Sequence, residues 1–123
     1  MKLALQLALA FLLFSLSARA QEFEQGTGAV CDTQKQMERY VALFDGDAEA
    51  AIDAVNAEEH DPTACALATV TYLRGPQLET VRTKDTAFEI VRILVVGVST
   101  PQGVRPVKPA AFFTVFGVLE YPA

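Results

Sequence analysis

The sequence is poor in the side chains that most enzyme and metal sites require. Its 123 residues include no tryptophan, one histidine and two cysteines. After residue 20 the only serine is Ser99, and no Gly-x-Ser-x-Gly segment is present, which excludes a serine nucleophile of that type. A zinc site usually needs three or four protein ligands, more than this chain offers. We therefore expect no metal, no cofactor and no catalytic residue of a standard kind.

Clusters of basic residues are also missing. The chain has 10 lysines and arginines against 15 aspartates and glutamates. Nucleic-acid binding depends on grouped Lys and Arg side chains that contact phosphates, so nucleic acid is excluded as a partner. The acids concentrate in residues 21–61, where eleven of them accompany only Lys35 and Arg39. We interpret this acidic half as a solvated helical surface.

The first twenty residues have the three-part layout of a secretory signal peptide. Met1-Lys2 gives a positive start, residues 3–16 are almost all apolar, and Ala18-Arg19-Ala20 places small residues at the expected cleavage site. The apolar run is shorter than the roughly twenty residues that a membrane-spanning helix needs. We expect cleavage after Ala20, a mature protein without membrane attachment, and a periplasmic or secreted location.

Cys31 and Cys65 both lie in the part of the chain that would be exported. An even pair of cysteines in an oxidising compartment predicts a disulfide. Redox motifs usually place their cysteines two residues apart, unlike this pair. Closing a loop of this length would stabilise the fold by about 3–4 kcal/mol on the chain-entropy model.

The mature chain is long enough for one domain, which we expect over residues 31–123 after a flexible N-terminal segment, residues 21–30. Helical periodicity follows Cys31 and indicates two helices joined by a tight turn, a helical hairpin. Thr33 and Gln36 fit a capping box for the first helix. Asp47 is a candidate N-cap for the second helix, which should end at Asp61-Pro62 because the residue before proline avoids helical angles.

The chain after Pro62 favours strands. The richest apolar run, residues 88–98, carries apolar side chains on both faces and predicts a central strand. Turns are expected at Gly75-Pro76 and at Thr83-Lys84-Asp85. The other expected strands are 64–74, 78–82, a short edge strand at 104–107, and 112–121. The predicted fold class is α+β, with an N-terminal helical hairpin packed on a four- to five-stranded antiparallel sheet that is compatible with a small barrel.

The single histidine stands in an acidic segment at the end of the second expected helix. An imidazole beside carboxylates is a candidate general acid–base pair, which makes Glu59, His60 and Asp61 candidate site residues. The alternative is a polar helix end, because adjacent residues of a helix do not face the same way. A small hydrolase that uses acids around Glu58–Asp61 therefore stays open as a hypothesis.

The β half is richer in apolar side chains than a domain of this size needs for its core. A leftover apolar patch would mark a homodimer interface or a groove for a partner protein. We take Arg74, Arg92, Phe112 and Phe116 as candidate interface residues. The leading hypothesis is thus a non-catalytic exported module that binds another protein or itself, or acts as structural support. A bacterial source is the leading interpretation, and a eukaryotic secreted protein is the alternative, because the signal alone does not separate the two. A further alternative is a secreted enzyme inhibitor that uses a projecting loop at Ser99–Pro109.

Overall fold

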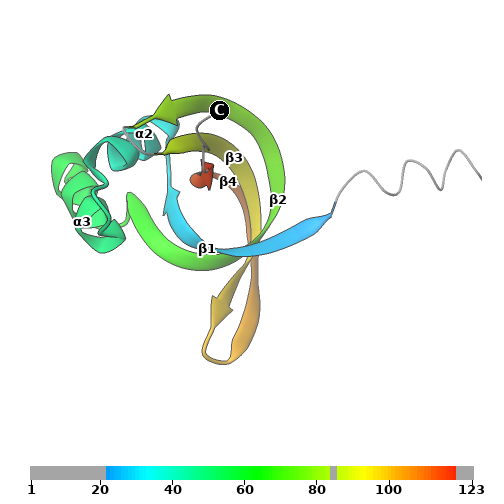
Figure 1. Cartoon of the computed structure of the whole chain (residues 1–123). Coiled ribbons are helices and arrows are strands. Elements are labelled where there is room, and N and C mark those ends of the chain that lie inside the picture. Colours follow the sequence, from blue (N-terminus) through cyan, green and yellow to red (C-terminus); the bar gives the residue numbers. More distant parts are fainter. Residues whose placement is uncertain (1–21, 84–85, 119–123) are drawn as a thin grey trace, which may run out of the picture.

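The computed structural model describes residues 22–83 and 86–118. The predicted signal peptide, the Lys84-Asp85 part of the expected turn, and the end of the expected last strand lie outside these residues. Two helices and a four-stranded antiparallel sheet make up a mixed α+β structure that is mostly sheet (Figure 1). The elements follow in the order β1 (Phe23–Cys31), α2 (Gln34–Leu43), α3 (Ala48–Glu59), β2 (Cys65–Arg82), β3 (Ala87–Thr100) and β4 (Gly103–Val118).

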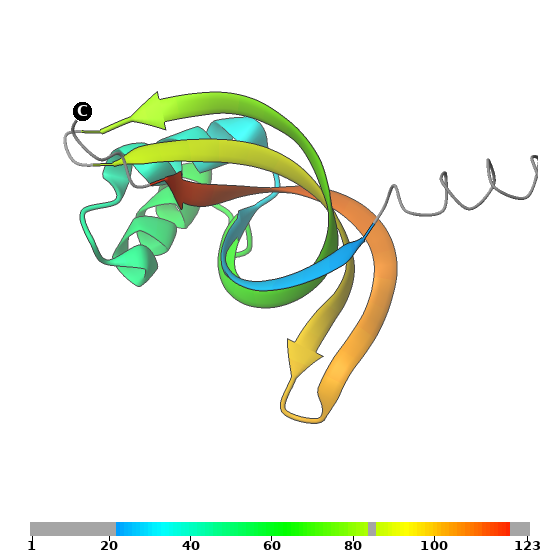
Figure 2. The same ribbon diagram turned by 45° about the vertical axis from the view of Figure 1, so that its right-hand side comes forward.

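The four strands pair in sequence order and then close on themselves. β1 pairs with β2 over nine positions, from Phe23 opposite Leu73 to Cys31 opposite Cys65. β3 lies between β2 and β4, as expected for the central strand. β4 then returns to β1 through only two residue pairs, one of which joins Cys31 to Phe113. The sheet is therefore a strongly curved ring with a short seam between β1 and β4 (Figure 2).

The N-terminal segment corrects one prediction. Residues 21–30 were expected to lack regular structure, yet β1 begins at Phe23. Glycine and threonine give this stretch no hydrophobic period, so its strand conformation comes from pairing with β2, far away in sequence. The helices consequently do not begin the folded chain. They lie between β1 and β2, and not at the N-terminus as predicted.

The local signals for the two helices are confirmed. The Thr33 hydroxyl accepts a hydrogen bond from the Gln36 amide, and the Gln36 side chain accepts one from the Thr33 amide. The Asp47 carboxylate accepts from the Ala50 amide and caps α3. Side-chain capping of this kind satisfies amides that have no partner inside the helix. α3 ends at Glu59, three residues before Pro62.

Two expected breaks in the strands are absent from the described structure. Gly75-Pro76 is not a turn but an irregularity inside the continuous strand β2. A Cβ atom on residue 75 would lie 2.5 Å from the Arg92 carbonyl oxygen, so the close approach of β3 requires glycine here. Likewise, Ser99–Pro109 is not a loop. β3 and β4 continue through it as a long hairpin with a turn at residues 101–102.

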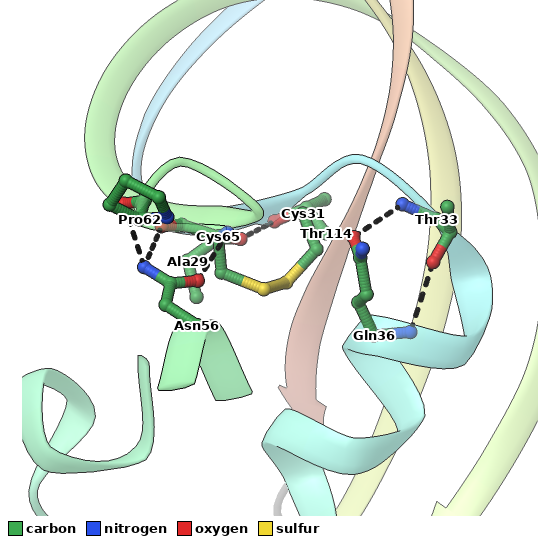
Figure 3. Close-up of a disulfide and its surroundings, with 8 residues drawn as sticks. All are labelled: Ala29, Cys31, Thr33, Gln36, Asn56, Pro62, Cys65 and Thr114. Carbon is green, nitrogen blue, oxygen red and sulfur yellow. Dashed lines mark hydrogen bonds between the residues drawn. A yellow bond between two sulfur atoms is a disulfide. The ribbon is translucent and has the colours of Figure 1, made fainter. Parts of the chain in front are cut away.

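The disulfide between Cys31 and Cys65 is confirmed. It joins the last residue of β1 to the first residue of β2, at the base of the helical segment (Figure 3). Asn56 of α3 reinforces this base: its side chain accepts from the Cys65 amide at 2.8 Å and donates to the carbonyl oxygens of Cys65 and Pro62 at 3.0 Å. On the other side, the Thr114 hydroxyl donates to the Ala29 carbonyl oxygen across the seam.

The described structure has two separate hydrophobic cores. The first core lies between the helices and the sheet and contains Ala29, Cys31, Met37, Tyr40, Val41, Ala51, Ile52, Val55, Cys65 and Ile90. The second core lies on the other face of the sheet, inside its curve, and contains Val70, Tyr72, Val91, Ile93 and Val95. β3 supplies residues to both cores, which explains why both of its faces are apolar.

Candidate binding surface

One face of the sheet, which we call the outer face, is covered by helices over only half of its length. Side chains of directly paired residues in an antiparallel sheet share a face. On β3, Ile90 is buried beneath the helices, whereas Arg92 and Leu94 on the same face are exposed. On β4, Phe113 packs against the first core and Ala111 is exposed. The outer face thus has a helix-covered half and a helix-free half.

A row of apolar side chains crosses the helix-free half. Phe23 pairs with Leu73, Leu73 with Leu94, and Leu94 with Ala111, so that every strand contributes one residue. We call these four residues the apolar row. Phe23 is 64% exposed and Leu94 is 38% exposed, while Leu73 is half-buried and Ala111 is exposed. An uncovered apolar row that spans a whole sheet is typical of a surface that contacts another molecule.

A depression adjoins the apolar row where β2 is irregular. It is lined by Leu73, Arg74, Gly75, Pro76, Arg92, Ile93, Leu94 and Ala111. The residues Gly75 and Pro76 carry no large side chain above the sheet, which leaves the hollow between Leu73 and Arg92. A partner side chain with an apolar stem and an acidic end could place its stem on the apolar row and its carboxylate near Arg92.

The structure separates the predicted interface residues between the two faces. Arg92 lies on the outer face, paired with Phe113. Phe112 and Phe116 pack against the second core on the inner face. Arg74 also lies on the inner face, where its Cζ atom is 4.0 Å from the centre of the Phe116 ring. The four residues therefore do not form one patch.

Arg74 is held by a local ion pair. Its guanidinium donates two hydrogen bonds to the Glu24 carboxylate on β1, at 2.9 and 3.0 Å. The hydrogen bond from Arg74 lowers the pKa of Glu24, and the same contact raises the pKa of Arg74. Both side chains are partly exposed, so the pair contributes little to stability. Its effect is to neutralise the acid at the edge of β1.

The inside of the curved sheet holds a small cavity of about 80 Å³. Its lining includes Gly26 and Gly28 of β1, Tyr72 of β2 and Thr114 of β4. Binding sites for small organic ligands usually enclose several hundred Å³. The cavity is too small for such a ligand.

The residues predicted as an acid–base site lie at an exposed helix end. His60 is the C-cap of α3, with a left-handed φ of 53°, and its side chain is exposed. Asp61 Oδ1 accepts hydrogen bonds from the Thr63 amide and hydroxyl, at 2.9 and 3.0 Å. Glu58 is bound to Arg39 at 2.7 Å, and the hydrogen bond from Arg39 lowers the pKa of Glu58. Asp61 is thus engaged in a local turn and Glu58 in an ion pair.

A shallow depression does bring two of these residues together. It is lined by Asp53, Asn56, Ala57, His60, Asp61 and Pro62. Glu59 is not part of the lining. Among the described residues, the His60 imidazole makes no hydrogen bond or ion pair with a carboxylate. The exposure of His60 also leaves the imidazole in water, where electrostatic interactions are weak.

The pKa of the Asp32 carboxyl is raised above its usual value. Partial burial is the larger cause, and the nearby negative charge of Asp61 adds to it. Asp32 and Asp61, near the base of the helical segment, do not by themselves make a cation site. Within residues 22–83 and 86–118, no group of three or more His, Cys, Asp or Glu side chains is arranged to hold a metal ion.

The β3–β4 hairpin projects from the body of the molecule, away from α2 and α3 (Figure 1, Figure 2). Its exposed part carries Arg105 and Lys108 but no acid between Ser99 and Pro109. Val104 near the tip is 56% exposed. Ser99–Pro109, the segment predicted for an inhibitor, is thus accessible and forms the end of the β3–β4 hairpin.

The apolar row was missed at the level of sequence because it depends on register. Phe23 stands in a segment read as flexible, and Leu73, Leu94 and Ala111 each look like ordinary strand residues. Only the pairing of all four strands places them side by side. A large aromatic residue in a polar segment, Phe23, was the one available signal.

Comparison with known proteins gives no relative. No family model matches the chain, and neither a curated protein nor a solved structure is detectably similar to it. The disulfide fits an extracellular or periplasmic protein. Neither of the two described helices is long and apolar enough to cross a membrane.

Proposed function

We propose that this protein is a non-catalytic, exported module that binds another protein through the helix-free half of its outer face. The observation that carries the proposal is the apolar row. The helices bury one half of an apolar sheet face, and nothing in the described residues buries the other half. A partner that covers the apolar row would bury its side chains, as α2 and α3 bury the apolar side chains of the helix-covered half.

The chemistry of this surface limits the partner. The row offers apolar contact, and Arg92 beside it offers a positive charge that makes no ion pair with a carboxylate of the described residues. Arginine and aromatic side chains are frequent in the energetically important centres of protein interfaces. We therefore expect a partner surface with an apolar centre and an acidic residue near Arg92.

A capture experiment tests the proposal. The mature protein is immobilised and exposed to the native extracytoplasmic fraction, in parallel with a Leu94→Glu variant. Leu94 is partly exposed, so a charge there should leave the fold intact, which a melting curve verifies. We expect a partner that binds the native protein and is lost with Leu94→Glu, because the charge would be buried unpaired in the interface.

Val104→Glu is the matched control and also separates a second candidate function. The projecting hairpin favours an enzyme inhibitor as that candidate, because an exposed basic arm can enter the acidic cleft of a target enzyme. Loss of the partner with Val104→Glu but not with Leu94→Glu would support the inhibitor and contradict the proposed surface. Equal capture by all three proteins would contradict both.

A further inference from the structure

Two of the unpaired strand edges of the sheet, on β1 and on β4, differ in their chemistry. Among the described strands, β1 pairs over residues 23–27 with β2 alone, and β4 pairs over residues 103–112 with β3 alone. Natural proteins protect exposed edges with prolines and charged side chains, which prevent another strand from adding. The unpaired part of β4 carries two prolines and two cations: Arg105, Pro106, Lys108 and Pro109. It is a protected edge.

The edge of β1 has none of these protections. Residues 23–27 contain no proline and no lysine or arginine. The one charged residue, Glu24, is already neutralised by Arg74 of the same chain. This edge also begins with Phe23, the most exposed large apolar residue among those described. An added strand would therefore find free backbone groups, no unpaired charge and an apolar side chain to cover.

These properties suit a second copy of the same strand. A twofold axis reverses the direction of a strand, so β1 can pair antiparallel with β1 of another copy. An axis through Gln25 pairs residues 23–27 of the two copies and leaves Gly28 and Ala29, which lie next to the seam with β4, outside the pairing. Phe23 of each copy then lies opposite Thr27 of the other. An axis through Glu24 would instead place two acids face to face, which disfavours that register.

We infer that two copies of this chain associate by antiparallel pairing of their β1 strands, centred on Gln25. The pairing joins the two sheets edge to edge. Phe23 at the end of each apolar row then lies beside Thr27 of the other copy on the same face, so that the helix-free halves form one larger surface. The N-terminal half of β1 lies at the outside of the molecule, on the side away from the helices, where a second copy has access (Figure 1, Figure 2).

The inference goes beyond the proposed function, and the two can fail separately. Leu94 lies on β3 and is separated from β1 by strand β2, so Leu94→Glu should abolish partner capture and leave self-association unchanged. A dimer without a captured partner would count against the proposed function only. A captured partner with a monomeric protein would count against the β1 pairing only.

Sedimentation velocity of the exported, disulfide-bonded protein over a wide concentration range tests the association. We expect a concentration-dependent dimer. Gln25→Lys would place two lysines opposite each other and should weaken the dimer at least about fivefold. Val104→Lys is the control, because it adds the same charge at an exposed position on the protected hairpin and should leave the association constant unchanged.

Cross-linking tests the register. Directly opposed residues of antiparallel strands have Cβ atoms close enough for a disulfide after small adjustments. Gln25→Cys should therefore form a covalent dimer under mild oxidation, whereas Val104→Cys should not. A monomeric mass at every concentration would overturn the inference. So would a dimer that Gln25→Lys leaves intact, or one that Gln25→Cys does not cross-link.

Discussion

The two halves of the outer face carry similar apolar residues but have opposite surroundings. Over the helix-covered half, Ile90 belongs to the first core, which also contains residues of both helices and the disulfide, and Phe113 packs against that core. Over the helix-free half, Leu94 and Ala111 continue the same two strands and remain open. The pattern of a strand therefore does not reveal whether its face is buried within the chain. That depends on where the helices stop, and here they stop halfway.

The largest expected effect comes from the covalent clamp on the helix-covered half. Replacing both Cys31 and Cys65 by alanine should lower the free energy of unfolding by about 3–4 kcal/mol, the value for a loop of this length. Denaturant titration measures the loss. Hydrogen exchange should increase most in α2 and α3, whose ends the disulfide holds together. An equal increase in hydrogen exchange in the two helices and in the β3–β4 hairpin would contradict the division of the molecule into a helix-covered and a helix-free region.

A matched pair of substitutions on β3 compares the two cores directly. Ile90 and Ile93 are 0% and 1% exposed and belong to the first and second core. Either change to alanine should cost about 2–5 kcal/mol, because each leaves a cavity. The two variants should differ in which part of the structure becomes more accessible to hydrogen exchange. Hydrogen exchange should increase in the helices for Ile90→Ala and around the curve of the sheet for Ile93→Ala, and the same map for both variants would contradict two cores.

A smaller effect tests the bulge beside the apolar row. Gly75→Ala would place its Cβ against the Arg92 carbonyl oxygen and force the two strands apart, at a cost of about 1–3 kcal/mol. Gly28→Ala is the control, because a Cβ there has no neighbour within 4 Å. It should be neutral or slightly stabilising, since alanine reduces the entropy of the unfolded chain. Thermal melts of the two variants measure the difference, and equal melting temperatures would contradict it.

Local chemistry made part of this structure predictable. The capping box of Thr33 and Gln36, the Asp47 cap and the cysteine pair depend on nearby residues or on simple counting, and the structure confirms them. The central strand was also recognisable, because a run that is apolar on both faces is typical of a strand that contributes to a core on each face. These features need no knowledge of how distant segments meet.

Features set by distant contacts were not predictable in the same way. β1 has no hydrophobic period, and its strand conformation follows from nine pairs with β2. Gly75-Pro76 has the composition of a turn, yet strong pairing on both sides of it keeps β2 continuous. The candidate surface depends on four strands in register. The candidate acid–base residues, by contrast, were expected at a helix end and lie there, where Asp61 accepts hydrogen bonds from Thr63 and the neighbouring Glu58 pairs with Arg39.

The position of the disulfide determines how the protein responds to proteolytic cleavage. Everything between Cys31 and Cys65, both helices included, is a closed covalent loop attached to the sheet at its base. A single cut at the exposed turn around Asp45-Gly46 would leave one molecule of unchanged mass apart from an added water. Both fragments stay tethered beside the strands that they cover, so a nicked chain retains every part that it needs to remain assembled.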